Sequence, residues 1–208
     1  MVGTRVITVA CAKGGTAKTT TSMMLACCLC RRGLRAVVLD ADNTGGATKW
    51  ADAVDDMRVD DPHAPMLPFD VVPVNQAVLD RRRLETRWSG MWIVIDTPPS
   101  DTGMIQKAMD VADVVVIPTQ PGEADLRLAG ETYAACRHGV VLLTRVKANT
   151  RSLRRAVDDL DSAHVTRFDT MVPERESIRG AYGRVRVDAW YAGVAGELVD
   201  FVNGLEAR

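Results

Sequence analysis

Residues 13–20 of the chain are Lys-Gly-Gly-Thr-Ala-Lys-Thr-Thr, and they follow closely on the apolar run Val6-Ile7-Thr8-Val9-Ala10. A strand that leads into a glycine turn, and then into a helix opening with Lys-Thr, is a recurrent way of cradling phosphate groups. The backbone amides from Gly14 to Thr19 would point into one concavity, and the helix would add the positive end of its dipole. The sequence therefore predicts a nucleotide-phosphate site close to its start.

Two lysines and a threonine give this loop its predicted chemistry. Lys18 would reach the outer phosphates of ATP, and the Thr19 hydroxyl would hold Mg²⁺. The ordinary phosphate-loop pattern has glycine at two positions where this chain has Ala12 and Ala17, and an additional lysine, Lys13, precedes the glycine pair. The loop residues predicted to contact the nucleotide are Gly14, Gly15, Thr16, Ala17, Lys18, Thr19 and Thr20.

The composition is that of an ordinary globular protein, with 47% hydrophobic and 25% charged residues. At 208 residues, we expect a single domain over residues 1–208. Apolar runs rich in Val, Ile, Leu and Ala favour a parallel sheet covered on both faces. No apolar run approaches the roughly 20 residues of a membrane helix. Because the first strand begins almost at once, we expect neither a signal peptide nor an N-terminal DNA-reading domain.

Apolar strands alternate with amphipathic stretches, which predicts an α/β fold with a mostly parallel, twisted sheet. The expected strands are Arg5–Ala10, Ala36–Asp40, Phe69–Val74, Met91–Asp96, Val114–Pro118, Val140–Arg145 and Phe168–Val172. The expected helices include Lys18–Arg31, Asn75–Arg87, Asp125–Arg137, Ser152–Asp161 and Asp188–Leu205. Asp55–Pro68 holds three prolines and four aspartates, so we expect a surface loop there.

The five cysteines do not form a disulfide framework in this pattern. Cys27 and Cys30 make a C-x-x-C pair, for which a redox or metal site is one alternative. No second pair or nearby histidine completes such a site, and cysteine is readily buried, so we favour a structural role. The cytosol is the expected compartment.

Carboxylates follow two of the expected strands. One strand ends in Asp40-Ala41-Asp42, and the strand Trp92-Ile93-Val94-Ile95 runs into Asp96. Groups at the carboxyl ends of parallel strands line the ligand crevice. We therefore predict that Asp40 and Asp96, with Thr19, form the Mg²⁺ site, since such a carboxylate can hold a metal-bound water. The alternative for the first pair is that one carboxylate merely caps the next helix.

Four motifs, in this order, resemble those of the ParA/MinD group of P-loop ATPases. Lys13 before the glycine pair is similar to the deviant Walker A motif of that group, and the D-x-D ending in Asp42 has the matching spacing. Asp96-Thr97-Pro98-Pro99-Ser100 is similar to its D-x-P-P-S switch segment, and Ala112–Pro118 to its A-D-x-V-x-x-P strand. The chain departs from the family after Asp42, where Asn43-Thr44 replace the usual Pro-Gln.

The resemblance implies a slow ATPase that uses hydrolysis as a timer. ATP would bring two copies face to face, Lys13 of each would cross to the other's phosphates, and Asp42 would orient the attacking water. The implied catalytic residues are Lys13, Lys18 and Asp42, and the base would be held by Thr144, Arg145, Val172 and Pro173. The ATP-bound homodimer would bind DNA without sequence preference on the nucleoid. A ParB-like centromere-binding partner would stimulate hydrolysis, so that plasmid or chromosome copies are positioned.

A basic segment is the candidate surface for that DNA. Between Arg145 and Arg186 there are ten Lys/Arg and six Asp/Glu, a local balance of +4 in a chain whose net charge is −1. Such a segment is either a solvated face or a phosphate-contacting surface, and the family resemblance favours the second. The predicted DNA-binding residues are Arg151, Arg154, Arg155, Arg175, Arg179 and Arg184.

Three alternatives remain beside DNA partition. A ParA-like positioner of another cargo, such as a protein microcompartment or a chemoreceptor cluster, would have the same sequence features. A MinD-like membrane protein needs a basic amphipathic tail, whereas Val194–Arg208 carries three acidic residues against Arg208 alone, so we expect no membrane partner. An iron protein is disfavoured, since Cys136 is the only cysteine beyond residue 30, and a metabolic ligase is disfavoured, since no constellation of charged substrate anchors stands out.

Overall fold

The computed structural model describes residues 3–206 and is built around one six-stranded sheet. The strand order is β3-β2-β4-β1-β5-β6, and every neighbouring pair is parallel. The strands are β1 (Arg5–Val9), β2 (Ala36–Asp40), β3 (Asp70–Pro73), β4 (Trp92–Asp96), β5 (Val114–Thr119) and β6 (Gly139–Leu143). The predicted parallel α/β architecture is therefore confirmed.

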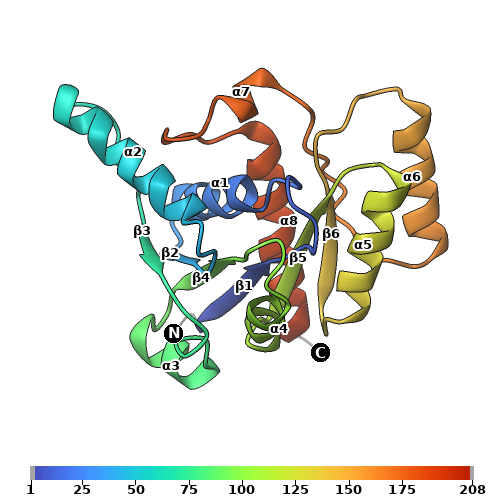
Figure 1. Cartoon of the computed structure of the whole chain (residues 1–208), viewed down its shortest axis with the longest axis horizontal. Helices are drawn as coiled ribbons and strands as arrows, with labels where there is room; N and C mark the ends of the chain where they lie inside the picture. The colour runs from blue at the N-terminus through green and yellow to red at the C-terminus, as the bar shows by residue number, and fades with distance from the viewer. Residues whose placement is uncertain (1–2, 207–208) are drawn as a thin grey trace.

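Helices cover both faces of the sheet (Figure 1). They are α1 (Lys18–Arg31), α2 (Gly46–Asp60), α3 (Arg81–Arg87), α4 (Thr102–Asp110), α5 (Glu123–Ala134), α6 (Arg151–Ser162), α7 (Glu176–Arg179) and α8 (Ala189–Glu206). On one face, α1 and α8 pack side by side against the central strands, while α3 and α4 pack on the other. Within the described residues, no helix combines the length and apolar character needed to cross a membrane.

Most predicted elements form, and α1 has the predicted bounds. The expected loop Asp55–Pro68 is wrong in its first part, because α2 continues to Asp60. Trp50 and Val54 are buried and anchor the first half of this helix, and residues 55–60 extend it, because each residue added to a formed helix gains a hydrogen bond. In Figure 1 the far end of α2 extends away from the sheet.

Two further predictions need correction. The expected helix Asn75–Arg87 begins only at Arg81, because the Asp80 carboxylate caps it by accepting a hydrogen bond from the Arg83 amide at 3.0 Å. The expected strand Phe168–Val172 does not form a seventh strand. Only isolated parallel bridges form, and they flank this segment: Arg167 pairs with Val141, and Pro173 pairs with Val146.

The C-x-x-C cysteines lie on α1. Cys27 and the neighbouring Cys28 are buried in the core, whereas Cys30, the second cysteine of the pair, is partly exposed; burial raises the pKa of the Cys27 thiol to about 12 and that of Cys28 to about 11. Such thiols hold their protons and act as apolar core atoms. Arg208, which belongs to the acidic tail considered above, lies outside the described residues, as do the two ends of the predicted domain 1–208.

Candidate nucleotide site

The phosphate loop connects β1 to α1 at the carboxyl edge of the sheet (Figure 1). Gly15 and Ala17 both have the left-handed backbone conformation, with φ of 75° and 72°. This explains why glycine is usual at the position of Ala17, since a left-handed L-residue costs roughly 1–2 kcal/mol. Ala17 is also the residue before α1, so the helix starts at the predicted phosphate lysine.

Lys18 is buried beneath this loop, with 7% of the residue exposed. Its Nζ donates a hydrogen bond to the Lys13 carbonyl oxygen at 2.9 Å. Burial lowers the pKa of Lys18, while the electrostatic effects of Cys11, Asp96 and Asp42 oppose that shift. A partly desolvated ammonium held by one carbonyl is well prepared to bind phosphate oxygens instead.

Asp96 lies at the end of β4 and has no exposed surface. Its Oδ1 accepts a hydrogen bond from the Ser22 hydroxyl at 3.0 Å, whereas its Oδ2 is buried and has no hydrogen-bond partner within residues 3–206. Burial raises the pKa of this carboxyl to about 7, against the opposing effects of the Thr19 and Ser22 hydroxyls and Lys18. A buried carboxylate oxygen without a partner is expected where a cation or its water binds.

The residues around Asp96 suit Mg²⁺. Thr19 lies next to Gly46, the first residue of α2, and a Cβ on Gly46 would stand only 3.1 Å from the Thr19 hydroxyl oxygen. Among the residues of known position, no three His, Cys, Asp or Glu side chains gather as a metal cage. Mg²⁺ at a nucleotide needs only one or two protein oxygens, which Thr19 and Asp96 can supply, and takes the rest from phosphates and water.

Asp40 is in register with Asp96 on the neighbouring strand and is 2% exposed. Its Oδ2 accepts two hydrogen bonds from Thr48, one from the amide at 2.8 Å and one from the hydroxyl at 2.7 Å. Its Oδ1 accepts a hydrogen bond from the Asp42 amide at 3.2 Å. This arrangement favours the capping alternative for Asp40, because Thr48 stands in the first turn of α2.

Asp42 is half-buried at the start of the turn that leads into α2. Its Oδ1 accepts a hydrogen bond from the Thr44 amide at 2.9 Å, which closes the turn. Its negative charge is near enough to Lys18 to act on the pKa of that lysine. The structure thus brings Asp42 to the same edge as Lys18 and Asp96, and its predicted action on water stays a prediction.

Lys13 forms an ion pair with Asp125. Asp125 lies in the first turn of α5, and its side chain is 13% exposed against 41% for Lys13. No sequence pattern indicated this partner, since the two residues are 112 positions apart. Gly14 approaches the predicted switch segment, where a Cβ on it would be 3.8 Å from Pro99.

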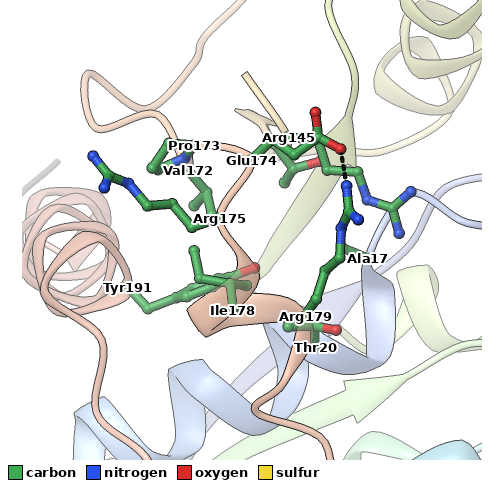
Figure 2. A pocket seen from close by; sticks show the side chains of 11 residues that line it. Ala17, Thr20, Arg145, Val172, Pro173, Glu174, Arg175, Ile178, Arg179 and Tyr191 are labelled. Carbon is green, nitrogen blue, oxygen red and sulfur yellow. Dashed lines mark hydrogen bonds and ion pairs between the residues drawn. The ribbon is translucent and has the colours of Figure 1, made fainter. Parts of the chain in front are cut away.

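A hollow adjoins the phosphate loop. Figure 2 shows its lining, to which α1, α7, α8 and the segments after β6 contribute. All four residues predicted to hold the base line it, together with two from the phosphate loop: Thr144, Arg145, Val172, Pro173, Ala17 and Thr20. The Thr144 hydroxyl also donates to the Thr16 carbonyl at 3.3 Å, which fixes this wall to the loop.

The predicted DNA-binding arginines divide into separate groups. Arg175 and Arg179 line the hollow of Figure 2, where Arg179 pairs with Glu174. Arg151, Arg154 and Arg155 are exposed on α6, and Arg184 is exposed before α8. The three arginines of α6 therefore share one helix, while the others lie on different segments. The assignment of these residues to DNA stays a prediction.

Several site residues escaped the sequence analysis. Thr48, Ser22 and Asp125 contact the predicted carboxylates or Lys13, and Glu174 pairs with both Lys147 and Arg179 at the hollow. Ser22 carried a usable signal, because it lies one helical turn after Lys18 and its hydroxyl donates to the Lys18 carbonyl at 3.1 Å. Thr48, Asp125 and Glu174 carried no such signal in the sequence.

Comparison with protein families agrees with this geometry. The model of the "CobQ/CobB/MinD/ParA nucleotide binding domain" matches residues 7–186. The chain belongs to this family. The resemblance noted in the sequence motifs is therefore confirmed, and the phosphate loop, the Asp96 strand and the residues predicted to hold the base all lie inside the matched range.

Curated relatives of this ParA/MinD-type chain differ in their named roles. "Maintenance of carboxysome distribution protein A" of Gloeobacter kilaueensis is 34% identical over 86% of this chain and 77% of its own length. Soj, a sporulation initiation inhibitor protein of Bacillus subtilis, is 31% identical over 56% of this chain and 58% of its own. "Protein ParA" of Rhizobium radiobacter is 25% identical over 61% of this chain and 54% of its own.

Solved structures share the fold over nearly the whole chain. The ATP complex of a Cyanothece McdA variant has a TM-score of 0.74 at 17% identity, covering 98% of each chain. The Mg-ADP complex of the septum site-determining protein MinD from Pyrococcus horikoshii has a TM-score of 0.72 at 18% identity, covering 99% of each. The chain therefore has the fold of P-loop ATPases.

Proposed function

We propose that the chain is an ATP-hydrolysing positioning protein whose switch is an ATP-bound homodimer. The observation that carries this proposal is the difference in burial and contacts between the two lysines of the phosphate loop. Lys18 is buried and lies close enough to Asp96 for their charges to interact, whereas Lys13, at the other end of the loop, is half exposed and pairs with Asp125 of α5. Lys18 alone suffices to bind the phosphates of the ATP held by the same copy. Lys13 is therefore available for the ATP of another copy.

The chain's own residues supply each part of phosphoryl transfer. The loop amides and Lys18 hold the phosphates, and the Thr19 hydroxyl and Asp96 hold Mg²⁺, which neutralises charge on the β- and γ-phosphates when bound. Asp42, at the same strand edge, orients the attacking water. The α/β scaffold fixes these groups before the reaction, and such preorganisation is the main source of rate in this chemistry.

Lys13 completes the site of the neighbouring copy. Its ammonium supplies positive charge to the transferring phosphate in trans, as an arginine finger does, which is worth about 10³–10⁵-fold in rate in related chemistry. A two-fold dimer makes this exchange reciprocal, because each copy offers the same surface. Hydrolysis is therefore tied to dimerisation.

The nucleobase binds in the hollow of Figure 2, between Thr144-Arg145 and Val172-Pro173. The exposed arginines of α6, with Arg175, Arg179 and Arg184, contact DNA phosphates without reading sequence. We place the protein in the cytoplasm, associated with the nucleoid, with no membrane partner. A ParB-like adaptor stimulates hydrolysis and releases the dimer from DNA.

The cargo is either a protein microcompartment or a DNA molecule. The relative that matches 86% of this chain bears a name for carboxysome distribution, which favours a microcompartment. The relative named ParA favours segregation of plasmid or chromosome copies, which is the second candidate. Both cargoes use the same ATP switch.

The test is ATP hydrolysis by the purified protein with Mg²⁺, with and without nonspecific DNA and the product of the adjoining gene. We expect slow basal hydrolysis that rises several-fold only when both are present, and DNA binding that weakens steeply with salt. Activation by a small metabolite instead of DNA and protein would contradict the proposal. An adjoining gene for a shell component or for a DNA-binding protein separates the two cargoes.

A further inference from the structure

The ion pair between Lys13 and Asp125 occupies the side chain to which we assign the trans role. Asp125 belongs to α5, which follows β5, the neighbour of β1 in the sheet. Lys13 therefore has a partner inside its own chain. A lysine that reaches the neighbouring copy has to leave this partner first.

The backbone of Lys13 is also held within its own chain, by hydrogen bonds to its carbonyl oxygen. Its carbonyl oxygen accepts hydrogen bonds from Lys18 Nζ at 2.9 Å and from the Thr16 hydroxyl at 3.4 Å. The ammonium that binds phosphates thus also holds the backbone of the residue that crosses to the partner. A lysine ammonium has three N–H donors, so Lys18 can bind phosphate oxygens and keep this bond, and the side-chain contact with Asp125 is the one that has to break.

Asp125 is suited to release Lys13 at low cost. It stands in the first turn of α5, where the positive end of the helix dipole stabilises a carboxylate without any cation. The side chain also lies close to the backbone, since its Oδ2 would be 3.0 Å from a Cβ on Gly122. The start of α5 therefore offers the carboxylate a favourable place that does not depend on the lysine.

We propose that Asp125 is a positioning residue that holds Lys13 in its own chain and so sets the threshold for ATP-driven dimerisation. The proposal rests on the trans role of Lys13. Each protomer has to break one such pair to form the dimer, so the cost enters the dimerisation equilibrium twice. Removing the carboxylate then favours the dimer, a direction opposite to that of structural damage.

Glu123 offers a matched control. It lies in the same first turn of α5, carries the same charge and is exposed. Within the described part of the chain it makes no ion pair. Glu123→Gln therefore repeats the charge change of Asp125→Asn and its effect on the helix dipole, and leaves Lys13 in place.

The experiment is sedimentation of the full chain with Mg²⁺ and a non-hydrolysable ATP analogue, over a range of protein concentrations. We expect Asp125→Asn to tighten the dimer roughly 3- to 30-fold, because one ion pair of this exposure is broken in each protomer. Glu123→Gln should stay within about twofold of the wild type, and Asp125→Glu should return toward it. A dimer of Asp125→Asn that is unchanged or weaker overturns the proposal.

A second measurement keeps the two proposals apart. Amine-reactive labelling of Lys13, quantified by mass spectrometry against the exposed Lys107, reports the contact in a single protomer. Asp125→Asn should raise the Lys13 labelling rate several-fold, and Glu123→Gln should not. If labelling rises but the wild type does not dimerise with the analogue, the proposed function fails. Unchanged labelling shows that Asp125 does not hold Lys13.

Discussion

The carboxyl ends of β2 and β4 carry the same residue at paired positions, yet Asp40 and Asp96 have different surroundings. Both are buried, and they are partners in the sheet register. Asp40 accepts hydrogen bonds on both oxygens, from Thr48 and from the Asp42 amide. Asp96 has one oxygen bonded to Ser22 and one with no partner within residues 3–206.

The difference teaches that position in a parallel sheet does not by itself assign a carboxylate to the ligand. What assigns it is whether another part of the chain has already satisfied its oxygens. The start of α2 satisfies Asp40, so its charge stabilises the turn that carries Asp42. Asp96 keeps one oxygen without a partner, and its burial raises its pKa. Carboxyl groups with such shifted pKa values are common at functional sites.

Asp96→Asn tests the free oxygen and should have the largest effect. We expect Mg²⁺-dependent ATP hydrolysis to fall by about 10²-fold or more, because the amide cannot give Mg²⁺ a charged oxygen. Steady-state hydrolysis at saturating Mg²⁺ measures it. Hydrolysis within about threefold of wild type would remove Asp96 from the metal site.

The same carboxylate predicts a pH dependence of stability. Burial raises the pKa of Asp96 to about 7, while an unfolded aspartate titrates near its ordinary value of about 4. Between these values the folded protein keeps a proton that the unfolded chain has lost, so stability should fall as the pH rises from about 4 to 7 and level off above it. Thermal unfolding without nucleotide or Mg²⁺ measures this.

Asp96→Asn should remove that part of the pH slope and leave the protein more stable than wild type at pH 7. Mg²⁺ with ATP should stabilise the wild type more as the pH rises through 7, since the metal takes the ionised carboxylate. A wild-type slope identical to that of the variant would show that Asp96 is ionised throughout.

Asp40→Ala should act on stability more than on metal binding. It leaves the Thr48 amide, the Thr48 hydroxyl and the Asp42 amide without their acceptor, and we expect a loss of about 2 kcal/mol in the free energy of unfolding. Denaturant titration gives the value. A loss of Mg²⁺ affinity as large as that of Asp96→Asn, with unchanged stability, would reverse the assignment of the two carboxylates.

Thr48→Val should give the smallest effect of the series. It removes the hydroxyl donor at 2.7 Å and leaves the amide donor at 2.8 Å, so Asp40 stays partly satisfied. We expect a loss of about 1 kcal/mol in unfolding free energy and near-normal hydrolysis. Circular dichroism melts and the ATPase assay decide this. A loss as large as that of Asp40→Ala would mean that the hydroxyl, not the amide, anchors the carboxylate.

The sequence was informative wherever the chemistry is local. The strand, loop and helix from Val6 to Arg31 follow from periodicity and loop residues, and α1 has its predicted bounds. The four residues assigned to the base came from the family resemblance, and they line one hollow because the segment around Pro173 lies beside Val146, just after β6. The first of these features depends on neighbours along the chain and the second on the family.

Distant partners account for what the sequence could not predict. The roles of Asp40 and Asp96 depend on Thr48 and Ser22, and the resting position of Lys13 depends on Asp125, 112 residues away. The first half of α2 is anchored by the buried Trp50 and Val54, and from there the helix continues through the run of aspartates. In each case a contact with a distant part of the chain decides the local arrangement.

The central claim is that Lys13 serves the partner's ATP while Asp42 serves its own. Mixing two inactive variants, Lys13→Ala and Asp42→Ala, tests it directly. In a mixed dimer the Lys13→Ala subunit keeps its own Asp42 and receives Lys13 from the other copy. With random pairing, hydrolysis should recover to about a quarter of the wild-type rate per subunit, because about half of the dimers are mixed and one site in each is complete. A mixture that remains as inactive as its two components would contradict the account.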